Sequence, residues 1–384
     1  MIVRRYPIDA WDDSRLSYIG PKERLIFFDI ETTGLKAGRA EVYLIGALCH
    51  EKGRWELIQW FSEELSDEER LLSGFCELVA AKKRELGKPP ILVSYNGDGF
   101  DLPFLSGCLR AYGHFDVLKT ALSFDIYKHI RWLRGILGLS DMKLKTVEGF
   151  LSIGREDKYS GGELISVYQD YRSLKTSGGD GAEGAEELLR ILLLHNAEDI
   201  SYLPRVAEVL SYEALFSGGF ELSSADIVEL SGSKVLDLRL RLELPLPKEF
   251  IYEEGPYAVS ASGAEGELLN ITAELYSGEL KYFFADYKNY YYLPLEDRAI
   301  HKSVGEFVEK SSRQRAKREN CYQCMSGIFL PEPENVFAPV YHRSYGEKSG
   351  YALFSEELLS DKEELLRYAK SIMEHIKANL SAKR

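Results

Sequence analysis

The sequence predicts an α/β protein in which a mixed five-stranded sheet flanked by helices precedes a smaller, β-rich α+β domain. Two observations predict this class. Strand-like and helical segments alternate through the first half, whereas short strands separated by Gly-containing turns dominate the second. Because 384 residues exceed one ordinary core, we expect two domains, residues 1–210 and residues 211–384, the second without an assigned role.

The first half begins with three strands joined by short connections, which is typical of an antiparallel meander. A helix, a strand, a helix, a strand and further helix follow, and this order gives one mixed sheet with helices on its faces. The expected strands are 25–31, 41–49, 55–61, 90–95 and 122–125, and the expected helices begin near Ser66, Asp101 and Ala185.

The second half contains a segment of clean alternation, Val235–Leu244, whose leucines share one face and whose charged residues share the other. Such alternation is typical of an antiparallel sheet with one buried face. Further strands are expected at 257–262, 268–276 and 279–284, and a closing amphipathic helix is expected from near Ser360.

Composition limits the environment and the partners of the chain. The N-terminal residues lack the apolar segment of a secretory signal, and no apolar stretch is long enough to span a bilayer. Five cysteines, an odd number, do not form a disulfide framework. We therefore expect a cytoplasmic protein without a membrane partner. A net charge of −13 argues against generic attraction to nucleic acid, so metal ions and small basic patches would have to hold a polyanionic substrate.

One short strand ends in two carboxylates, Asp29 and Glu31. Side chains two residues apart on a strand point to the same side of the sheet. Neighbouring like charges at the end of an apolar strand are costly unless cations lie between them. A strand end that simply reaches solvent is the structural alternative.

Two further acidic positions follow elements of the same sheet. Asp101 comes after the strand 90–95 and a loop with an Asn-Gly pair, where it could also be a helix N-cap. His195 and Asp199 are four residues apart on the last helix, so they share one face, as many ordinary surface pairs do. Together with the strand carboxylates, these residues form a candidate site.

Three motifs in order resemble the DEDD superfamily of 3′–5′ exonucleases, and more narrowly its bacterial ribonuclease H-like branch. They are Asp29-x-Glu31 with Thr-Gly after it, Asn96-x3-Phe100-Asp101 and His195-x3-Asp199. The connecting segments 144–148, Gly161-Gly162 and Tyr168-x2-Tyr171 are also similar to that branch. The resemblance covers roughly residues 20–210 and implies a ribonuclease H-like fold for them.

The resemblance also implies an enzyme, a metal-dependent nuclease that hydrolyses phosphodiester bonds. Its metal-ligand positions fall on Asp29, Glu31, Asp101 and Asp199, which would hold two divalent cations, Mg²⁺ or Mn²⁺. Two such ions, about 4 Å apart, can stabilise both the attacking and the leaving oxygen of the reaction. His195 would accept the proton of the attacking water or orient that water.

The same resemblance implies how the terminal nucleotide is held. The implied substrate-binding residues are Thr32, Thr33, Gly34, Leu35 and Asn96. The implied partner is a nucleic acid with a free 3′ end, either DNA or RNA, that is single-stranded or frayed.

The histidine departs from the pattern of the family. Members with histidine usually place it five residues before the last Asp, whereas His195 lies four residues before Asp199, the spacing usual for tyrosine. Its role is therefore less defined than the roles of the carboxylates. Glu198 is an alternative ligand, and Asp125 is a candidate for a supporting group behind the ligands.

The stretch Lys281–Arg318 reverses the acidic balance of the chain, with nine Lys or Arg against five Asp or Glu, and it is rich in aromatic residues. Rings and cations together are typical of a single-stranded nucleic-acid track. The alternative, which we favour, is that the rings fill a small core. Cys321-x2-Cys324 lacks a second pair, so it does not predict zinc unless His301 or His342 lies close to it.

The leading hypothesis is a two-metal 3′–5′ exonuclease. A structure-specific endonuclease on the same fold is the first alternative, because four carboxylates do not by themselves select chain ends. A non-catalytic nucleic-acid-binding module is the second, although such a module would have no physical reason to keep four unpaired carboxylates together. No protein partner follows from the sequence.

Overall fold

The computed structural model describes residues 1–384 except 10, 12, 178–180, 231, 264–265 and 383–384. Contacts divide the chain into two compact units, Met1–Leu210 and Ser211–Arg384. Each unit contains its own sheets and its own buried clusters. No helix within the described ranges is long and apolar enough to cross a bilayer.

The first unit is built around a mixed six-stranded sheet. Its strands are β1 (Ile2–Ile8), β2 (Leu25–Thr32), β3 (Val42–Glu51), β4 (Arg54–Phe61), β5 (Ile91–Ser94) and β6 (Leu122–Asp125). Their order in the sheet is β1-β4-β3-β2-β5-β6. The first four strands of this order are antiparallel neighbours, whereas β5 and β6 run parallel to β2. The predicted fold class is confirmed, with one strand more than expected.

The additional strand is the N-terminal segment β1, which pairs with β4 at one edge of the sheet. Most of its side chains are exposed, so the segment lacks the apolar alternation that predicts a strand. It also contains Pro7, which an edge strand tolerates because one side of its backbone needs no partner.

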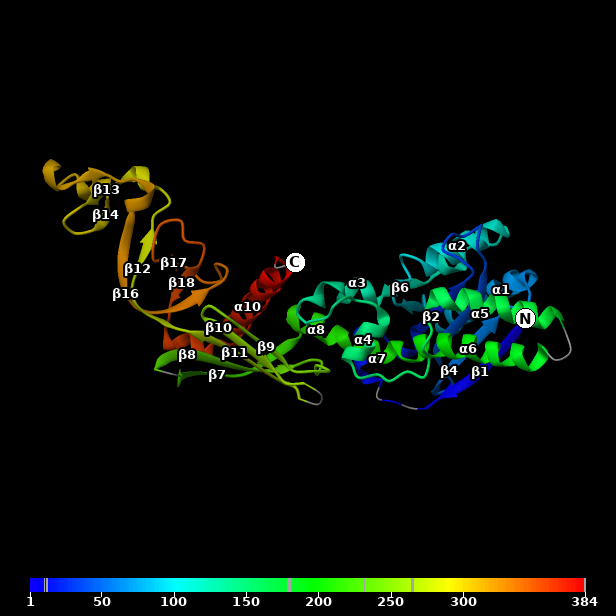
Figure 1. The fold of residues 1–384 in the computed structure, drawn as a ribbon. Helices are drawn as coiled ribbons and strands as arrows, with labels where there is room; N and C mark the ends of the chain where they lie inside the picture. Colours follow the sequence, from blue (N-terminus) through cyan, green and yellow to red (C-terminus); the bar gives the residue numbers. More distant parts are fainter. Residues whose placement is uncertain (10, 12, 178–180, 231, 264–265, 383–384) are drawn as a thin grey trace. The chain divides into compact units, whose positions relative to one another are not determined.

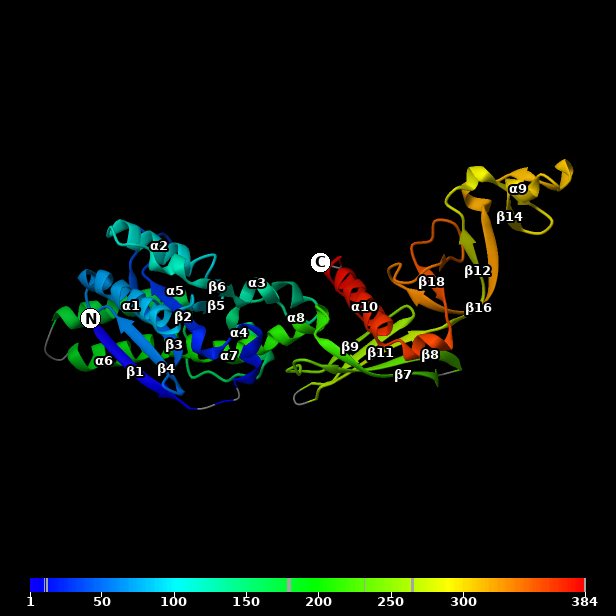
Figure 2. The ribbon, with the colours of Figure 1, turned by 180° about the vertical axis from the view of Figure 1, so that it is seen from behind.

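Helices cover both faces of this sheet (Figures 1 and 2). The helices of this unit are α1 (Glu68–Leu86), α2 (Asp101–Ala111), α3 (Ile126–Ile130), α4 (Leu144–Phe150), α5 (Gly161–Ser177), α6 (Gly181–Ser201) and α7 (Leu203–Val206), and α8 (Leu210–Phe216) leads into the second unit. The helices α1 and α2 pack on one face around Phe28 and Phe75. On the other face, α5 and α6 pack around Tyr43. Because α6 lies against β2 and β3, its C-terminal residues reach the end of β2.

The second unit is β-rich, as predicted, and its sheets are antiparallel. Its strands are β7 (Phe220–Leu230), β8 (Ser233–Leu242), β9 (Phe250–Glu254), β10 (Tyr257–Ala261), β11 (Leu268–Glu274), β12 (Tyr276–Phe283), β13 (Tyr290–Leu293), β14 (Arg298–His301), β15 (Gln314–Arg315), β16 (Tyr322–Glu332), β17 (Val340–Tyr341) and β18 (Gly350–Leu353). They form three sheets, with the orders β7-β8-β11-β10-β9, β12-β16-β18-β17 and β14-β13-β15. The closing helix α10 (Lys362–Ala382) buries Leu365, Ile372 and Ile376, and α9 (Lys302–Gly305) is a single turn.

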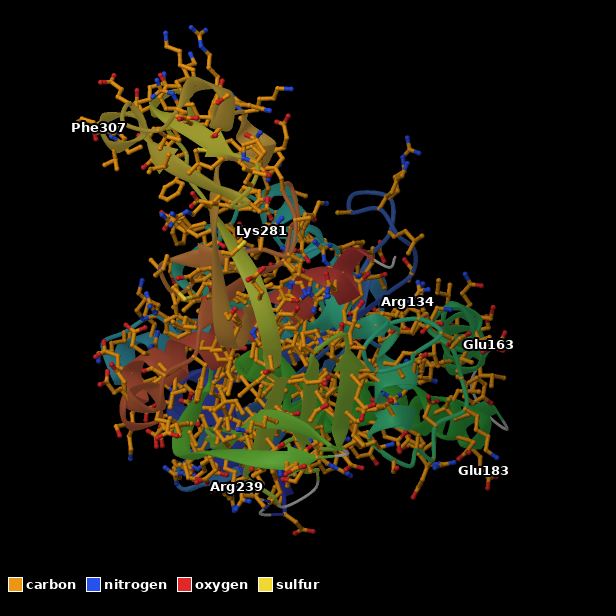
Figure 3. All side chains as sticks on the ribbon, turned by 90° about the vertical axis from the view of Figure 1, so that its left-hand side faces the viewer. Arg134, Glu163, Glu183, Arg239, Lys281 and Phe307 are labelled. Carbon is orange, nitrogen blue, oxygen red and sulfur yellow. The ribbon has the colours of Figure 1, made fainter. Side chains whose placement is uncertain are left out.

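The basic, aromatic stretch of the second unit contains the smallest sheet, β14-β13-β15. Four of its rings, Phe284, Tyr287, Tyr290 and Tyr292, pack against the buried Ala299, Ala316 and Cys321. The guanidinium of Arg313 lies 4.5 Å from the centre of the Tyr291 ring. These rings therefore serve a small core, while Phe307 is 91% exposed (Figure 3).

Candidate metal centre

The candidate site lies where β2, α2 and α6 meet. Asp29 and Glu31 are on β2, Asp101 is the first residue of α2, and Asp199 is near the end of α6. Since β2 and β5 are parallel, their C-terminal ends lie at the same edge of the sheet, and the loop after β5 delivers α2 to that edge. Three separate segments thus bring four carboxylates to one place.

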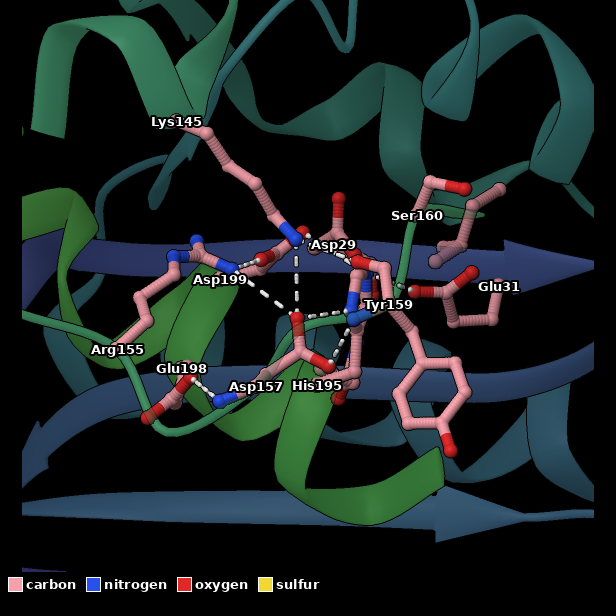
Figure 4. A network of polar contacts seen from close by, with 12 residues as sticks. Asp29, Glu31, Lys145, Arg155, Asp157, Tyr159, Ser160, His195, Glu198 and Asp199 are labelled. Carbon is pink, nitrogen blue, oxygen red and sulfur yellow. Dashed lines mark hydrogen bonds and ion pairs between the residues drawn. The ribbon is translucent and has the colours of Figure 1, made fainter. Parts of the chain in front are cut away.

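Glu31, His195 and Asp199 offer ligand atoms that all lie within 4.8 Å of one another (Figure 4). His195 Nε2 is 3.4 Å from Glu31 Oε1 and 3.6 Å from Asp199 Oδ2. His195 is 3% exposed, so it is not an ordinary surface histidine. The spacing of four residues on α6 places its ring beside Asp199, on the side that faces β2.

Asp101 is placed beside the two strand carboxylates rather than used as a helix cap. The N-cap of α2 is Phe100, and Asp101 is the first helical residue. Its Oδ1 accepts a hydrogen bond from the backbone N–H of Ile30, which lies between Asp29 and Glu31, at 3.2 Å. This bond holds the Asp101 carboxylate against the end of β2.

The electrostatics of these carboxylates favour a cation. Burial, followed by the charges of Asp101, Asp199 and Glu31, raises the pKa of Asp29 well above its ordinary value. Burial and the neighbouring carboxylates likewise raise the pKa of Glu31, and burial raises the pKa of Asp101 to about 7. Ionising all of them is therefore costly without a positive charge between them. Hard oxygen donors in this arrangement fit a hard divalent cation.

A glycine on β3 lets α6 approach Asp29. Gly46 lies opposite Asp29 in the β2–β3 pair, and a Cβ atom at this position would collide with the Asn196 and Ile200 side chains. Asn196 accepts a hydrogen bond from Gln59 at 2.9 Å and donates one to Asp29 Oδ2 at 3.3 Å. The absence of a side chain at position 46 therefore sets the distance between α6 and the first carboxylate.

Replacing Gly46 by alanine is expected to destabilise the protein by about 1–3 kcal/mol, because the new methyl group must displace α6 or β3. The same displacement should lower any activity that depends on His195 and Asp199. Urea unfolding and a nuclease assay check both effects. Gly162→Ala is the matched control, since a Cβ atom there meets nothing within 4 Å; equal stability of the two variants would contradict this role of Gly46.

The sequence did not reveal the residue that orients His195. Asp157, in the connector between α4 and α5, has an Oδ2 that lies 2.8 Å from His195 Nδ1. Burial raises the pKa of Asp157, but the Tyr159 N–H, the Lys145 ammonium and His195 outweigh it and bring the pKa below its ordinary value. An ionised Asp157 accepts a hydrogen bond from the His195 Nδ1–H group, so the other ring nitrogen, Nε2, faces Glu31 and Asp199.

Three further residues missed from the sequence surround this pair. Lys145 Nζ donates to Asp157 Oδ2 at 3.0 Å, and Arg155 contacts both Glu148 and Asp199. Lys145 and Glu148 lie in the segment 144–148 that carried part of the family resemblance, which was the one available signal. Arg155 and Asp157 belong to an irregular connector without a periodic pattern.

Glu198, the alternative ligand, and Asp125, the candidate supporting group, both form hydrogen bonds with backbone N–H groups. Glu198 accepts hydrogen bonds from the backbone N–H groups of Glu156 and Asp157, at 2.9 and 3.0 Å, so it holds the connector instead of facing the carboxylates. Asp125, at the end of β6, accepts hydrogen bonds from the backbone N–H groups of Asn96 and Asp98. Asp125 thus shapes the loop that leads to Asp101.

The predicted substrate-binding residues lie around the same edge. Thr32 donates a hydrogen bond to the Gly34 carbonyl at 2.8 Å, and Thr33 Oγ1 accepts one from the Glu41 N–H at 3.0 Å, so both shape the turn after β2. Leu35 is 84% exposed. Asn96 is exposed and has a φ of +66°, a conformation in the left-handed region that asparagine tolerates. Leu35 and Asn96 are therefore accessible to a ligand, whereas the Thr32 side chain is buried.

Comparison with known proteins agrees with the fold. Residues 26–211 match the family model of the RNase_H superfamily. A stretch of 110 residues is 34% identical to a DNA polymerase of Thermococcus aggregans, a match that covers 27% of this chain and 6% of the polymerase. The chain thus spans only a small part of that relative.

Solved structures that are similar to this chain have lower sequence identity to it. A family B DNA polymerase of Pyrobaculum calidifontis is 14% identical, with a TM-score of 0.40 over 94% of this chain and 46% of the polymerase. Escherichia coli exonuclease I, solved with a dA16 oligonucleotide, is 12% identical, with a TM-score of 0.27 over 57% of this chain and 54% of the exonuclease. The match of residues 26–211 to the RNase H superfamily model agrees with the ribonuclease H-like fold that their motifs predicted.

Proposed function

We propose that the protein is a two-metal 3′–5′ exonuclease of the DEDD type that acts on single-stranded or frayed DNA or RNA. One observation carries the proposal: ligand atoms of Glu31, His195 and Asp199 lie within 4.8 Å of one another, next to Asp29 and Asp101. The match of residues 26–211 to the RNase H superfamily model supports hydrolysis of a nucleic-acid backbone.

The four carboxylates would hold the divalent ions, Mg²⁺ or Mn²⁺. When bound, such ions supply positive charge to the attacking and the leaving oxygens of the phosphodiester. The chain itself offers oxygen ligands from two rigid elements, β2 and α6, and from the start of α2. The pKa values of Asp29, Glu31 and Asp101, which burial and then the neighbouring carboxylates raise, support this assignment, because bound cations would stabilise the charged forms.

His195 would act as the general base. Its Nδ1 proton is held by Asp157, so Nε2 is available to take the proton of the attacking water. As the water oxygen bonds to phosphorus, the P–O3′ bond breaks and the leaving oxygen acquires a proton from solvent. The products are a nucleoside 5′-monophosphate and a strand shortened by one nucleotide, with a new 3′ hydroxyl.

The turn after β2 would hold the terminal nucleotide. We assign this role to the backbone of Thr32, Thr33 and Gly34, to the exposed side chain of Leu35, and to Asn96 across the edge of the sheet. An exposed leucine beside a polar site offers an apolar surface on which the last base can lie. The local nature of these contacts fits an acidic chain, whose net charge of −13 does not attract polyanions over a distance.

The experiment that tests the proposal uses 5′-labelled single-stranded DNA and RNA with Mn²⁺. A ladder of products that shorten one nucleotide at a time is expected, and Asp29→Ala should abolish it. Glu187→Ala, which removes an exposed carboxylate of α6, should leave the ladder unchanged. Discrete internal cuts would favour an endonuclease, and metal-dependent binding without cleavage would leave a non-catalytic module. Comparing the two labelled strands also decides between DNA and RNA.

A further inference from the structure

We propose that the ion pair of Glu148 and Arg155 is a positioning device for Asp199. It would hold one oxygen of that carboxylate, so that Asp199 presents only the other oxygen to a metal ion. This inference rests on the proposed metal site, but it concerns residues outside the proposed ligand set. All three residues are in the first unit.

The contacts of Arg155 are short and directional. Its Nε and Nη2 donate to Glu148 Oε2 and Oε1 at 2.5 and 2.6 Å, which is the two-point geometry of an arginine–carboxylate fork. Its Nη1 donates to Asp199 Oδ1 at 2.5 Å. The side chains of Arg155 and Glu148 are 8% and 2% exposed, so neither swings freely in solvent. A guanidinium fixed in this way fixes the Asp199 carboxylate as well.

The two oxygens of Asp199 face different neighbours. Oδ1 accepts from Arg155, whereas Oδ2 is the oxygen that lies 3.6 Å from His195 Nε2, on the side of Glu31. Figure 4 shows Arg155 and His195 approaching Asp199 from different sides. The hydrogen bond to Arg155 thus determines which oxygen of Asp199 is available to an ion.

The connector that carries Arg155 is itself anchored on α6. Glu198, the residue before Asp199, accepts hydrogen bonds from the backbone N–H groups of Glu156 and Asp157. The connector in turn holds Asp199 through Arg155 and His195 through Asp157. This reciprocal arrangement fixes two neighbouring side chains of one helix turn, which hydrogen bonds within α6 alone could not do.

The opposite charges of Glu148 and Arg155 indicate that Arg155 orients Asp199 and does not compete with a metal ion for it. Arg155 is paired through two hydrogen bonds with a buried carboxylate, so the Glu148–Arg155 pair is close to neutral as a unit. A neutral, rigid hydrogen-bond donor orients a ligand without repelling the ion that the ligand holds. Partners behind metal ligands typically change metal affinity about 10–100-fold when they are removed.

The test is Mn²⁺ binding by the full chain without nucleic acid, measured from the electron paramagnetic resonance signal of free Mn²⁺. The main variant is Glu148→Gln/Arg155→Gln, which removes both charges and therefore leaves the net charge unchanged. We expect its Mn²⁺ affinity to fall about 10–100-fold. The matched control is Glu187→Gln/Arg190→Gln, which removes an exposed ion pair on α6 and should bind Mn²⁺ as the wild type does.

A second variant keeps the inference testable if the double variant fails to fold. Arg155→Lys retains the charge but loses the fork, so we expect a weakening of several-fold, with metal-free thermal unfolding used to verify the fold. Unchanged or tighter Mn²⁺ binding by a folded variant would overturn the inference, because Arg155 would then be inert or would compete with the ion. A wild type that binds no Mn²⁺ would instead overturn the proposed function, and the inference with it.

Discussion

Replacing Asp29 by asparagine is expected to lower kcat about 10³-fold or more while making the metal-free protein more stable. The loss of activity follows from the proposed role, because a neutral amide at this position would remove negative charge that would hold the divalent ions, a loss of stabilisation worth about 4 kcal/mol. Single-turnover cleavage of a labelled strand at saturating Mn²⁺ measures this loss.

The higher stability that we expect for metal-free Asp29→Asn arises because the negative charge of Asp29 is unfavourable when no cation is bound. Burial and the charges of Asp101, Asp199 and Glu31 raise the pKa of Asp29, so the folded state binds this proton more tightly than the unfolded state does. The free energy of unfolding then decreases as the pH rises above the ordinary pKa of an aspartate. Asparagine removes this penalty, so the variant should gain about 1 kcal/mol in EDTA at pH 8 and less at pH 5.

Asp98→Asn is the control for both measurements. Asp98 lies in the neighbouring loop, and although burial raises its pKa, the hydrogen bonds from Lys128 and Ser123 bring that pKa below its ordinary value. Removing its charge should therefore cost stability at pH 8, not increase it, and should leave cleavage intact. Full activity of Asp29→Asn, or equal stability shifts in the two variants, would contradict the assigned role of Asp29.

Replacing His195 by asparagine is expected to lower kcat by about 10²–10⁴-fold with little change in Mn²⁺ affinity. Two roles are open to a histidine that lies 3.4 and 3.6 Å from Glu31 and Asp199: proton acceptor or metal ligand. We assign the first role, in which the Asp157 carboxylate at Nδ1 would stabilise the imidazolium that forms when Nε2 takes a proton.

The two roles of His195 give different results. A proton acceptor affects kcat, whereas a ligand affects the Mn²⁺ concentration at half-saturation as well. Asp157→Asn extends the test, since an asparagine preserves the shape of the site and removes the charge behind the ring. It should reduce kcat by a smaller factor than His195→Asn. A weakening of Mn²⁺ binding by His195→Asn without a loss in kcat would contradict the role of general base.

The sequence predicted the parts of the fold that depend on continuous apolar segments. The strands that became β2, β3 and β4 are buried runs, and their order with the following helices leaves few possible topologies. The edge strand β1 was not predicted, because its mostly exposed residues show no alternation of apolar and polar side chains. None of the described strands after Phe283 was predicted; all but the eleven-residue β16 are only two to four residues long, too short for a periodic pattern.

The residue pairs of the candidate site that lie close together in the sequence were also predictable. Asp29 and Glu31 are two apart on a strand, and His195 and Asp199 are four apart on a helix, so local geometry alone places each pair. The residues behind them were not predictable in this way. Asp157 and His195 are 38 positions apart, and Arg155 and Asp199 are 44 apart, and contacts over such distances depend on the path of an irregular connector.

We expect the carboxylates of β2, α2 and α6 to hold divalent ions, and diffraction from a crystal soaked in Mn²⁺ is a direct test of this claim. Anomalous difference maps should show Mn²⁺ at about 2.2 Å from oxygens of Asp29, Glu31 and Asp199, with a second ion about 4 Å away. Asp199 should use Oδ2, with Oδ1 still bonded to Arg155. Maps without a peak among these side chains at saturating Mn²⁺ would contradict the claim.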